Sequence, residues 1–212
     1  MLNTASGKNF PFHATFFKYL LLYIKPENLE LTVTIPSADS LVEQCIKGDM
    51  SAYRLLYERY SKAMYNTALR ITNNRADAED MLQESFIDAF AQIRSFENKA
   101  TFGAWLKQIV VFKSIALLKK RRLSFTDLEK ETEELTEENI VDENEIAFTV
   151  ENIKKAMSQL PDGYRTVLSL YLLEGYDHEE IADIMRISQS TVRTQYKRGK
   201  QKLLQLLKKE DS

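Results

Sequence analysis

Apolar residues recur every three or four positions along most of this chain, the spacing that lines one face of an α-helix. In residues 39–122 this pattern predicts four successive helices. Gly48-Asp49 separates the first two, Asn73-Asn74 ends the second, and Asp77 and Thr101 can cap the third and fourth. The stripes of the first three are Leu41, Val42, Cys45 and Ile46; Tyr53, Leu56, Tyr57, Tyr60, Met64 and Ala68; and Leu82, Phe86, Ala89, Phe90 and Ile93.

The same periodicity returns in residues 151–209 and predicts a second, smaller group of helices. Two of them end at Pro161-Asp162-Gly163 and at Gly175. Asp177 with Glu180 matches a capping box, and Ser188 can cap the long last helix. A short helix, a tight turn and a basic second helix form a helix-turn-helix. No segment shows convincing period-two alternation, so the predicted fold is all-α, with the helix-turn-helix in the second of two small domains.

Charge is distributed unevenly along the chain. Residues 123–151 carry eleven acidic residues against Lys130, a net charge of −10 that leaves +8 on the rest of a chain whose total is −2. We expect residues 123–150 to be a flexible acidic linker between domains at 39–122 and 151–209. Such segregation is typical of a part that binds a polyanion beside an acidic connector.

Residues 1–38 are expected to be a disordered N-terminal extension. The unbroken apolar run Tyr19 to Ile24 is far shorter than the ~20 residues that span a bilayer. We expect the native chain to begin near residues 29–39. The alternative is that the aromatic and leucine-rich run docks on another surface, such as the apolar flank that Phe112 and Ala116 extend.

Composition argues against several classes of function. One cysteine, Cys45, excludes an internal disulfide framework, and the two histidines, His13 and His178, lie far apart. The six glycines form neither a GxGxxG motif nor a Walker loop. We therefore expect no catalytic residue, no metal site, no cofactor and no small-molecule substrate.

Two strongly basic segments, the last helix and the end of the fourth helix, are candidates for nucleic-acid binding. On the last helix, Val192, Tyr196, Gly199, Leu203 and Leu206 share the inner face. The opposite face carries donors and acceptors that can read bases and hold phosphates: Ser190, Arg193, Thr194, Lys197 and Gln201. The fourth helix of the first domain ends in Lys119-Lys120-Arg121-Arg122. Aromatic residues lie before and among its basic residues, and unpaired nucleotide bases can stack on such aromatic side chains. Structural interpretations remain open for both segments. The charges of the last helix could be a solvated face, the cations of the fourth helix also suit a helix C-terminus, and Trp105 and Phe112 could be core residues.

The third helix places Asp80, Glu84 and Asp88 at successive i+4 steps, with Gln83 beside them. Like charges at this spacing repel slightly. The stripe indicates either a protein-docking face or a plain solvated face. A hydrolase that uses these carboxylates is a weaker alternative, because no nucleophile or pocket-forming loop accompanies them.

These segments resemble bacterial RNA polymerase sigma factors of the extracytoplasmic-function (ECF) type. Residues 77–90, DAEDMLQESFIDAF, are similar to the signature of region 2, and Trp105-Leu106, Ile109 and the following basic run fit its continuation. Residues 160–165 (LPDGYR), 174–182 (EGYDHEEIA) and 187–193 (ISQSTVR) are similar to region 4. The resemblance implies a cytoplasmic, non-enzymatic protein that binds core RNA polymerase, recognises promoter DNA and is held by an anti-sigma factor.

The resemblance also assigns roles by position. Residues implied at the duplex −35 element are Arg186, Ser190, Thr191, Arg193, Thr194, Lys197 and Arg198. Residues implied at the melted −10 element are Phe96, Trp105, Phe112, Lys113, Lys119, Lys120, Arg121 and Arg122. Asp80, Gln83, Glu84 and Asp88 are implied at the polymerase, and the acidic linker would thread toward its active-site cleft.

The chain departs from the family pattern at three positions. Phe112 and Ala116 stand where the family commonly has Asn and Asp, and Arg186 stands where it often has Gly. A positive-φ turn costs a non-glycine residue on the order of 1 kcal/mol. Either the turn differs here, or Arg186 uses its charge on a phosphate. The remaining alternative is a helix-turn-helix regulator that dimerises and binds duplex DNA without polymerase.

Overall fold

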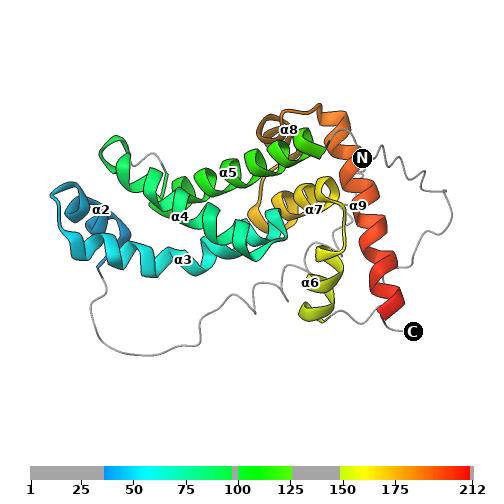
Figure 1. Cartoon of the computed structure of the whole chain (residues 1–212), viewed down its shortest axis with the longest axis horizontal. Helices are drawn as coiled ribbons and strands as arrows, with labels where there is room; N and C mark the ends of the chain where they lie inside the picture. The colour runs from blue at the N-terminus through cyan, green and yellow to red at the C-terminus, as the bar shows by residue number, and fades with distance from the viewer. Residues whose placement is uncertain (1–35, 97–99, 126–148, 211–212) are drawn as a thin grey trace, which may run out of the picture.

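The computed structural model describes residues 36–96, 100–125 and 149–210, and in these residues the secondary structure is entirely helical (Figure 1). The chain runs through two groups of helices, which we call the first half (α2–α5) and the second half (α6–α9). The elements are α2 (Ala38–Ile46), α3 (Met50–Thr72), α4 (Arg75–Ala91), a 3₁₀ turn (Ile93–Ser95), α5 (Phe102–Phe125), α6 (Val150–Ser158), α7 (Asp162–Ser169), a π-helical turn (Leu170–Glu174), α8 (His178–Met185) and α9 (Gln189–Glu210).

Most of the helix starts lie where the sequence predicts them. The Thr101 hydroxyl accepts the Ala104 N–H at 3.2 Å, and the Ser188 hydroxyl accepts that of Thr191 at 3.1 Å. Asp177 and Glu180 form the predicted capping box at the start of α8. These caps satisfy N–H groups that would otherwise lack partners in the first turn of each helix.

The predicted cap of the third helix is wrong. Asn74, not Asp77, is the N-cap of α4, and its side chain accepts the Asp77 N–H at 3.2 Å. The preceding Asn73 ends α3 in the left-handed conformation, with φ 53°. Asparagine suits both positions, because it tolerates positive φ and its side-chain oxygen caps well. The helix therefore begins three residues earlier than predicted, and the Asp77 carboxylate is left to pair with Arg121.

The first half packs around one apolar core. Helix α3 lies against both α4 and α5, and α2 closes one end of the group (Figure 1). Leu41, Leu56, Phe102 and Leu106 are fully buried in this core. Aromatic pairs join the helices, as where the Tyr53 and Phe90 rings lie 4.9 Å apart, edge to face. The predicted stripes thus form the core, except that Ile46 and Tyr57 remain 38% and 40% exposed.

The second half builds a smaller core between α6, α7 and α9. Leu160, Leu168 and Leu203 are buried in it. Gly199 permits the close approach of α9 to α7, because a Cβ there would lie 3.1 Å from the Cβ of Tyr164 and 3.3 Å from Leu168 Cδ1. The inward face of α9 is as predicted at Val192, Gly199 and Leu203. Toward the end of α9, however, the buried residues are Leu204 and Leu207 rather than Leu206.

The two halves pack directly against each other, which the sequence did not predict. We call this contact the seam. Its apolar centre is buried on both sides and consists of Ile71, Val111, Ile115 and Leu118 from the first half and Val167, Leu170, Ile181, Ala182, Ile184 and Val192 from the second.

Most of the predicted extension and most of the predicted linker lie outside the described residues, so the division into four segments stays a prediction. Helix α2 begins at Ala38, inside the range given to the extension. Within the described parts of the chain, no helix is both long enough and apolar enough to cross a bilayer.

Candidate nucleic-acid interface

The helix-turn-helix is formed by α8, the turn at Arg186 to Ser188, and α9. Arg186 takes the left-handed conformation, with φ 50°, and the Ile187 N–H donates to the Ala182 carbonyl at 3.0 Å. The turn therefore has the positive φ that the family pattern implies, although a non-glycine residue occupies it. Buried Ile181, Ile184 and Val192 hold the two helices together beneath the turn.

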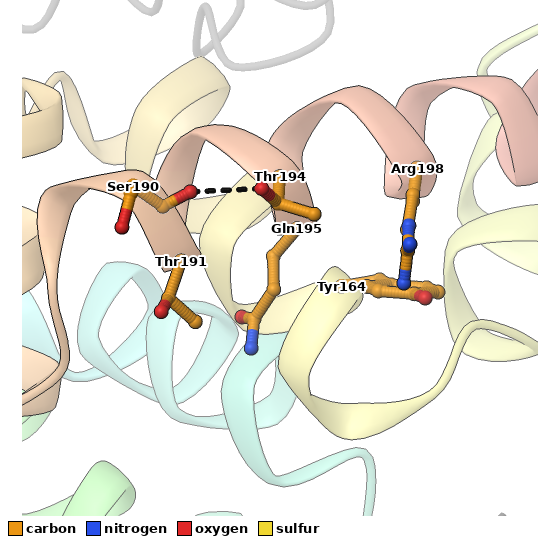
Figure 2. A pocket seen from close by; sticks show the side chains of 6 residues that line it. All are labelled: Tyr164, Ser190, Thr191, Thr194, Gln195 and Arg198. Atoms are coloured by element: carbon orange, nitrogen blue, oxygen red, sulfur yellow. Dashed lines mark hydrogen bonds between the residues drawn. The ribbon is translucent and has the colours of Figure 1, made fainter. Parts of the chain in front are cut away.

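Hydroxyl groups at the start of α9 are organised by one another. The Ser188 hydroxyl lies 2.8 Å from those of both Ser190 and Thr191. The Thr194 hydroxyl donates to the Ser190 carbonyl at 2.9 Å, as Figure 2 shows. Because that donor is occupied, Thr194 can offer an incoming base only lone pairs and its methyl group.

The outward face of α9 carries exposed cations. Arg193, Lys197 and Arg198 are exposed, and within the described residues no carboxylate forms an ion pair with them. The predicted Ser190, Thr191 and Thr194 are exposed on the same stretch of helix, and Arg186 is exposed in the turn before it. The structure thus brings the whole predicted −35 group onto one side of the helix-turn-helix.

A hollow of about 340 Å³ opens beside this face, between α9 and the start of α7. Its walls are Tyr164, Ser190, Thr191, Thr194, Gln195 and Arg198. In Figure 2 the Arg198 side chain extends from α9 onto the ring of Tyr164.

The sequence did not identify Tyr164 and Gln195 as residues that line a hollow beside α9. The Gln195 side-chain oxygen is buried without a partner, and a Cβ at position 163 would lie 3.3 Å from it. The available signal was Gly163, which was interpreted only as part of a helix stop. It lies in the first turn of α7 and leaves room for a neighbouring side chain.

His178, the first residue of α8, lies among aromatic rings. It stacks on Tyr171 with centroids 4.7 Å apart and meets Tyr196 edge to face at 5.3 Å. Burial, and secondarily the nearby Arg193 charge, lowers the pKa of His178 below its ordinary value. The neutral ring therefore supports the helix-turn-helix from within.

Aromatic residues of the predicted −10 group cluster near the start of α5. Phe96 and Trp105 are half-buried, with their rings 5.1 Å apart, and Trp105 also lies against the fully buried Phe102. Phe112, two turns further along α5 than Trp105, is 53% exposed. Trp105 therefore belongs partly to the core, while Phe112 presents its ring to solvent.

The cations of α5 are less free than those of α9. Lys113 bonds to Glu84 at 3.2 Å and Asp88 at 2.8 Å, and its hydrogen bond to Asp88 raises the pKa of the ammonium. Arg121 pairs with Asp77. Lys119 is half-buried, and burial together with the Arg186 charge lowers its pKa. Of the predicted run, only Lys120 is exposed, and the side chain of Arg122 lies outside the described residues.

The acidic stripe follows the outer side of α4. Asp80, Gln83 and Glu84 are exposed, and Asp88 is half-buried. Glu84 and Asp88 share Lys113 across the α4–α5 contact. Across the described residues, no group of three histidine, cysteine or acidic side chains could hold a metal ion.

Comparisons with known proteins agree with this arrangement. Residues 56–123 match the family model of Sigma-70 region 2, and residues 151–203 match that of Sigma-70, region 4. Over 177 residues the chain is 30% identical to the ECF RNA polymerase sigma factor SigW of Bacillus subtilis, covering 79% of this chain and 95% of that relative. It is 31% identical over 172 residues to the ECF RNA polymerase sigma-E factor of Haemophilus influenzae, covering 76% and 90%.

A solved structure has a similar fold. It is the sigma factor RpoE in a co-crystal with the anti-sigma factor NepR from Bartonella quintana, with a TM-score of 0.50 and 22% identity. The similarity covers 74% of this chain and 96% of that one.

Proposed function

Because this chain belongs to the ECF family of sigma factors, it directs transcription initiation with core RNA polymerase, and we propose that its two halves read different promoter elements. The single observation that carries this division is the exposed face of α9. Arg193, Lys197 and Arg198 project there without carboxylate partners in the described residues, beside a hydroxyl-bearing first turn. The assignment of each residue below is our proposal.

The second half reads the duplex −35 element with α9 in the major groove. In this geometry the N-terminal part of a recognition helix meets base edges, and the preceding helix crosses the backbone. Arg193 is suited to a guanine, because its guanidinium can donate two parallel hydrogen bonds. Lys197, Arg198 and Arg186 hold phosphates, and Ser190, Thr191 and Thr194 contribute shorter-range polar contacts.

The first half holds the melted −10 element along α5. The exposed Phe112 ring and the Phe96–Trp105 pair offer surfaces on which unpaired bases can stack. Lys120 is exposed and can hold a phosphate. Lys119, Arg121 and Arg122 complete the basic end of the helix, and Lys113 lies near its middle. Phe112 and Ala116 replace polar groups of the family pattern, so we infer that stacking contributes more here than side-chain hydrogen bonds.

The acidic side of α4 docks on core polymerase. Asp80 and Gln83 are exposed, and Asp80 forms no ion pair within the described residues. Asp80→Lys is therefore a cleaner probe than a change at Glu84, whose carboxylate also holds Lys113. We expect the variant to lose holoenzyme formation with its helix content intact. If it competes for core polymerase as well as the parent chain, the stripe is a solvated face.

The family consists of initiation factors rather than enzymes, and we infer that this chain has no catalytic activity of its own. We also infer that it works in the cytoplasm and is regulated by an anti-sigma factor. The similar fold of RpoE, which was crystallised with the anti-sigma factor NepR, supports the proposed regulation by an anti-sigma factor.

The decisive test is run-off transcription with bacterial core polymerase on a library of genomic promoters. The proposal predicts that the monomeric chain selects a small set of promoters that share −35 and −10 sequences. The alternative, a helix-turn-helix regulator, predicts a dimer that shifts duplex DNA alone and gives no specific transcript. Specific DNA binding with no dependence on polymerase would overturn our proposal.

A further inference from the structure

The hollow beside α9 lies along one of two polar edges of that helix. Ser190, Thr194 and Arg198 follow one another at steps of four residues, so they form a row along the edge that lines the hollow. Arg193 and Lys197 form a second exposed row, turned about 100° around the helix from the first. The two rows therefore face different parts of any DNA whose groove α9 enters.

The position of the hollow matches that of a DNA backbone. A helix that fills the major groove of duplex DNA has one phosphate backbone on each side. If Arg193 meets base edges, as proposed above, the row that contains Arg198 is turned toward one of these backbones. On that side the start of α7 flanks α9, and the hollow of about 340 Å³ lies between them. One backbone phosphate can therefore enter the hollow while α9 occupies the groove.

Two glycines allow α7 to approach α9 closely at the hollow. Gly163, in the first turn of α7, leaves room for the Gln195 amide, because a Cβ at position 163 would lie 3.3 Å from its Oε1. Gly199, next to Arg198, leaves room for Tyr164, whose Cβ would lie 3.1 Å from a Cβ at position 199. This close approach brings the Tyr164 ring within reach of the Arg198 side chain (Figure 2).

The Arg198 side chain is directed toward α7. It is exposed and forms no ion pair within the described residues, and in Figure 2 it extends onto the ring of Tyr164. A guanidinium over an aromatic face is attracted to the ring and keeps most of its five N–H donors for another ligand. An unsupported arginine loses rotamer freedom when it binds, so the ring lowers the entropy cost of contact with a phosphate.

The walls of the hollow provide hydroxyl groups and one cation, and none of the described residues that line it is acidic. The Ser188 hydroxyl lies 2.8 Å from those of both Ser190 and Thr191, and either atom of each pair can be the donor. Asp162, at the start of α7, is bound to Arg165 and lines a different cavity. A phosphate group in DNA has a negative charge and only acceptor oxygens, so these side chains suit it.

Gln195 adds a buried acceptor to the same hollow. Its Oε1 has no hydrogen-bond partner among the described residues, and an unpaired buried acceptor is costly. The hollow has room for a water molecule beside a phosphate group, and a water can donate one hydrogen to Gln195 and the other to a phosphate oxygen. A bound phosphate would thereby hold in place a water that pairs with this acceptor.

We propose that the hollow is a phosphate subsite of the −35 surface, in which Arg198 and the hydroxyls of Ser190 and Thr191 bind one backbone phosphate. Tyr164 is its positioning residue, because its ring holds the Arg198 side chain beside the hollow. This inference rests on the proposed reading of the −35 element by α9, and it adds the start of α7 to the DNA interface. A phosphate held at a fixed place sets the register of α9 on the duplex.

A scan of the DNA backbone tests the subsite without changing the protein. Each phosphate of the −35 element is replaced in turn by an uncharged methylphosphonate, in a promoter that the run-off assay selects, and holoenzyme binding is measured. We expect one substitution to weaken binding by the parent holoenzyme about tenfold and to have no further effect on Arg198→Ala. Lys197→Ala is the matched control, because it removes a cation from the other edge of α9 and should keep the full effect at this phosphate.

Variants of Tyr164 test its positioning role. Tyr164→Phe keeps the ring and should keep the tenfold effect of the methylphosphonate, whereas Tyr164→Leu removes the ring and should reduce the effect to about twofold. Arg198→Lys keeps the charge but not the planar group, and it should also reduce the effect to about twofold. Because Tyr164 also packs against the core of the second half, helix content and thermal unfolding of each variant are measured alongside.

The outcomes separate this inference from the function on which it rests. If Arg198→Ala is as sensitive as the parent chain at every phosphate, the subsite is wrong. If folded Tyr164→Leu and Arg198→Lys both keep the tenfold effect, or Tyr164→Leu weakens binding equally at all phosphates, Tyr164 has no positioning role. If no methylphosphonate in the −35 element weakens binding by the parent holoenzyme, α9 does not lie on this DNA and the proposed function itself fails.

Discussion

The outer face of α9 and the basic end of α5 are both proposed to meet DNA, yet they hold their cations differently. Arg193, Lys197 and Arg198 on α9 pair with no carboxylate of the described residues, whereas Lys113 and Arg121 on α5 are bound to acids of α4. A free cation can replace a small counterion with a phosphate directly. A paired cation must first give up a protein carboxylate, which reduces its net contribution to DNA binding.

This difference suggests an order of events. The proposed −35 surface on α9 already has unpaired cations in the described residues, whereas cations of the proposed −10 surface on α5 are held by carboxylates of α4. Polymerase that docks on α4 would take over Glu84 and Asp88 and thereby release Lys113. Binding of polymerase and completion of the −10 surface would then be coupled through one lysine.

Alanine substitutions on α9 should have the largest effect, because Arg193 and Lys197 have no carboxylate partners in the described residues. We expect Arg193→Ala to cost about 1–3 kcal/mol of holoenzyme binding and to relax base preference at one −35 position. Lys197→Ala should weaken binding equally on all sequences and reduce the salt dependence by about one charge. Filter binding at several salt concentrations measures both effects. Unchanged binding by both variants would show that α9 does not enter the groove.

The paired state of Lys113 should appear in the stability of the free chain. Because Glu84 and Asp88 are about half exposed, we expect Lys113→Met to lower the free energy of unfolding by only ~0.5 kcal/mol. The pKa of Lys113 is raised in the folded chain, so its contribution is complete below the ordinary pKa of 10.5 and is lost as the pH rises above it.

Urea unfolding of the parent and the Lys113→Met variant between pH 7 and 11 tests this contribution. The difference between the two should stay constant up to about pH 10 and then narrow. A difference that does not depend on pH would mean that Lys113 contributes through packing of its stem alone.

Acid should affect the second half through His178. Its pKa is lowered on folding, chiefly by burial, so the neutral ring adds stability above pH 6.5 that is lost as the pH falls through the folded pKa. His178→Phe keeps the stack on Tyr171 and removes the titration. We expect the stability of the parent chain to fall relative to the variant between pH 6.5 and 5. If stability falls equally with pH in the two chains, His178 is not the source of the loss of stability in acid.

The smallest expected effect is at Arg186. Glycine would relieve a positive-φ strain of about 1 kcal/mol but would add a similar entropy to the unfolded chain. Arg186→Gly should therefore change stability by only a few tenths of a kcal/mol. If Arg186 holds a phosphate, the Arg186→Gly variant should bind promoter DNA more weakly than the parent chain at low salt. At high salt the two chains should bind with equal affinity. Equal affinity at all salt concentrations would leave Arg186 without a role at DNA.

The sequence by itself determined the helices and the outward face of α9. Apolar spacing and caps such as Thr101 and Ser188 are local features, and a helix that buries Val192 and Gly199 must turn Arg193 and Lys197 outward. The same local reasoning wrongly placed the cap of α4 at Asp77. It treated Asn73 and Asn74 together as the end of the preceding helix, although either asparagine can end or begin a helix. Only the cap geometry distinguished Asn73 from Asn74.

Tertiary structure alone decided what the charged side chains contact. Nothing in the spacing of Lys113 or Arg121 shows that α4 brings carboxylates to them, and nothing near Glu174 indicates that Arg70, more than a hundred residues away in sequence, lies against it. Ile71 on α3 and Leu118 on α5 are buried against residues of the second half, and nothing in the spacing of either helix identified that partner surface. Periodicity reports which side of a helix avoids water, but not which other surface covers it.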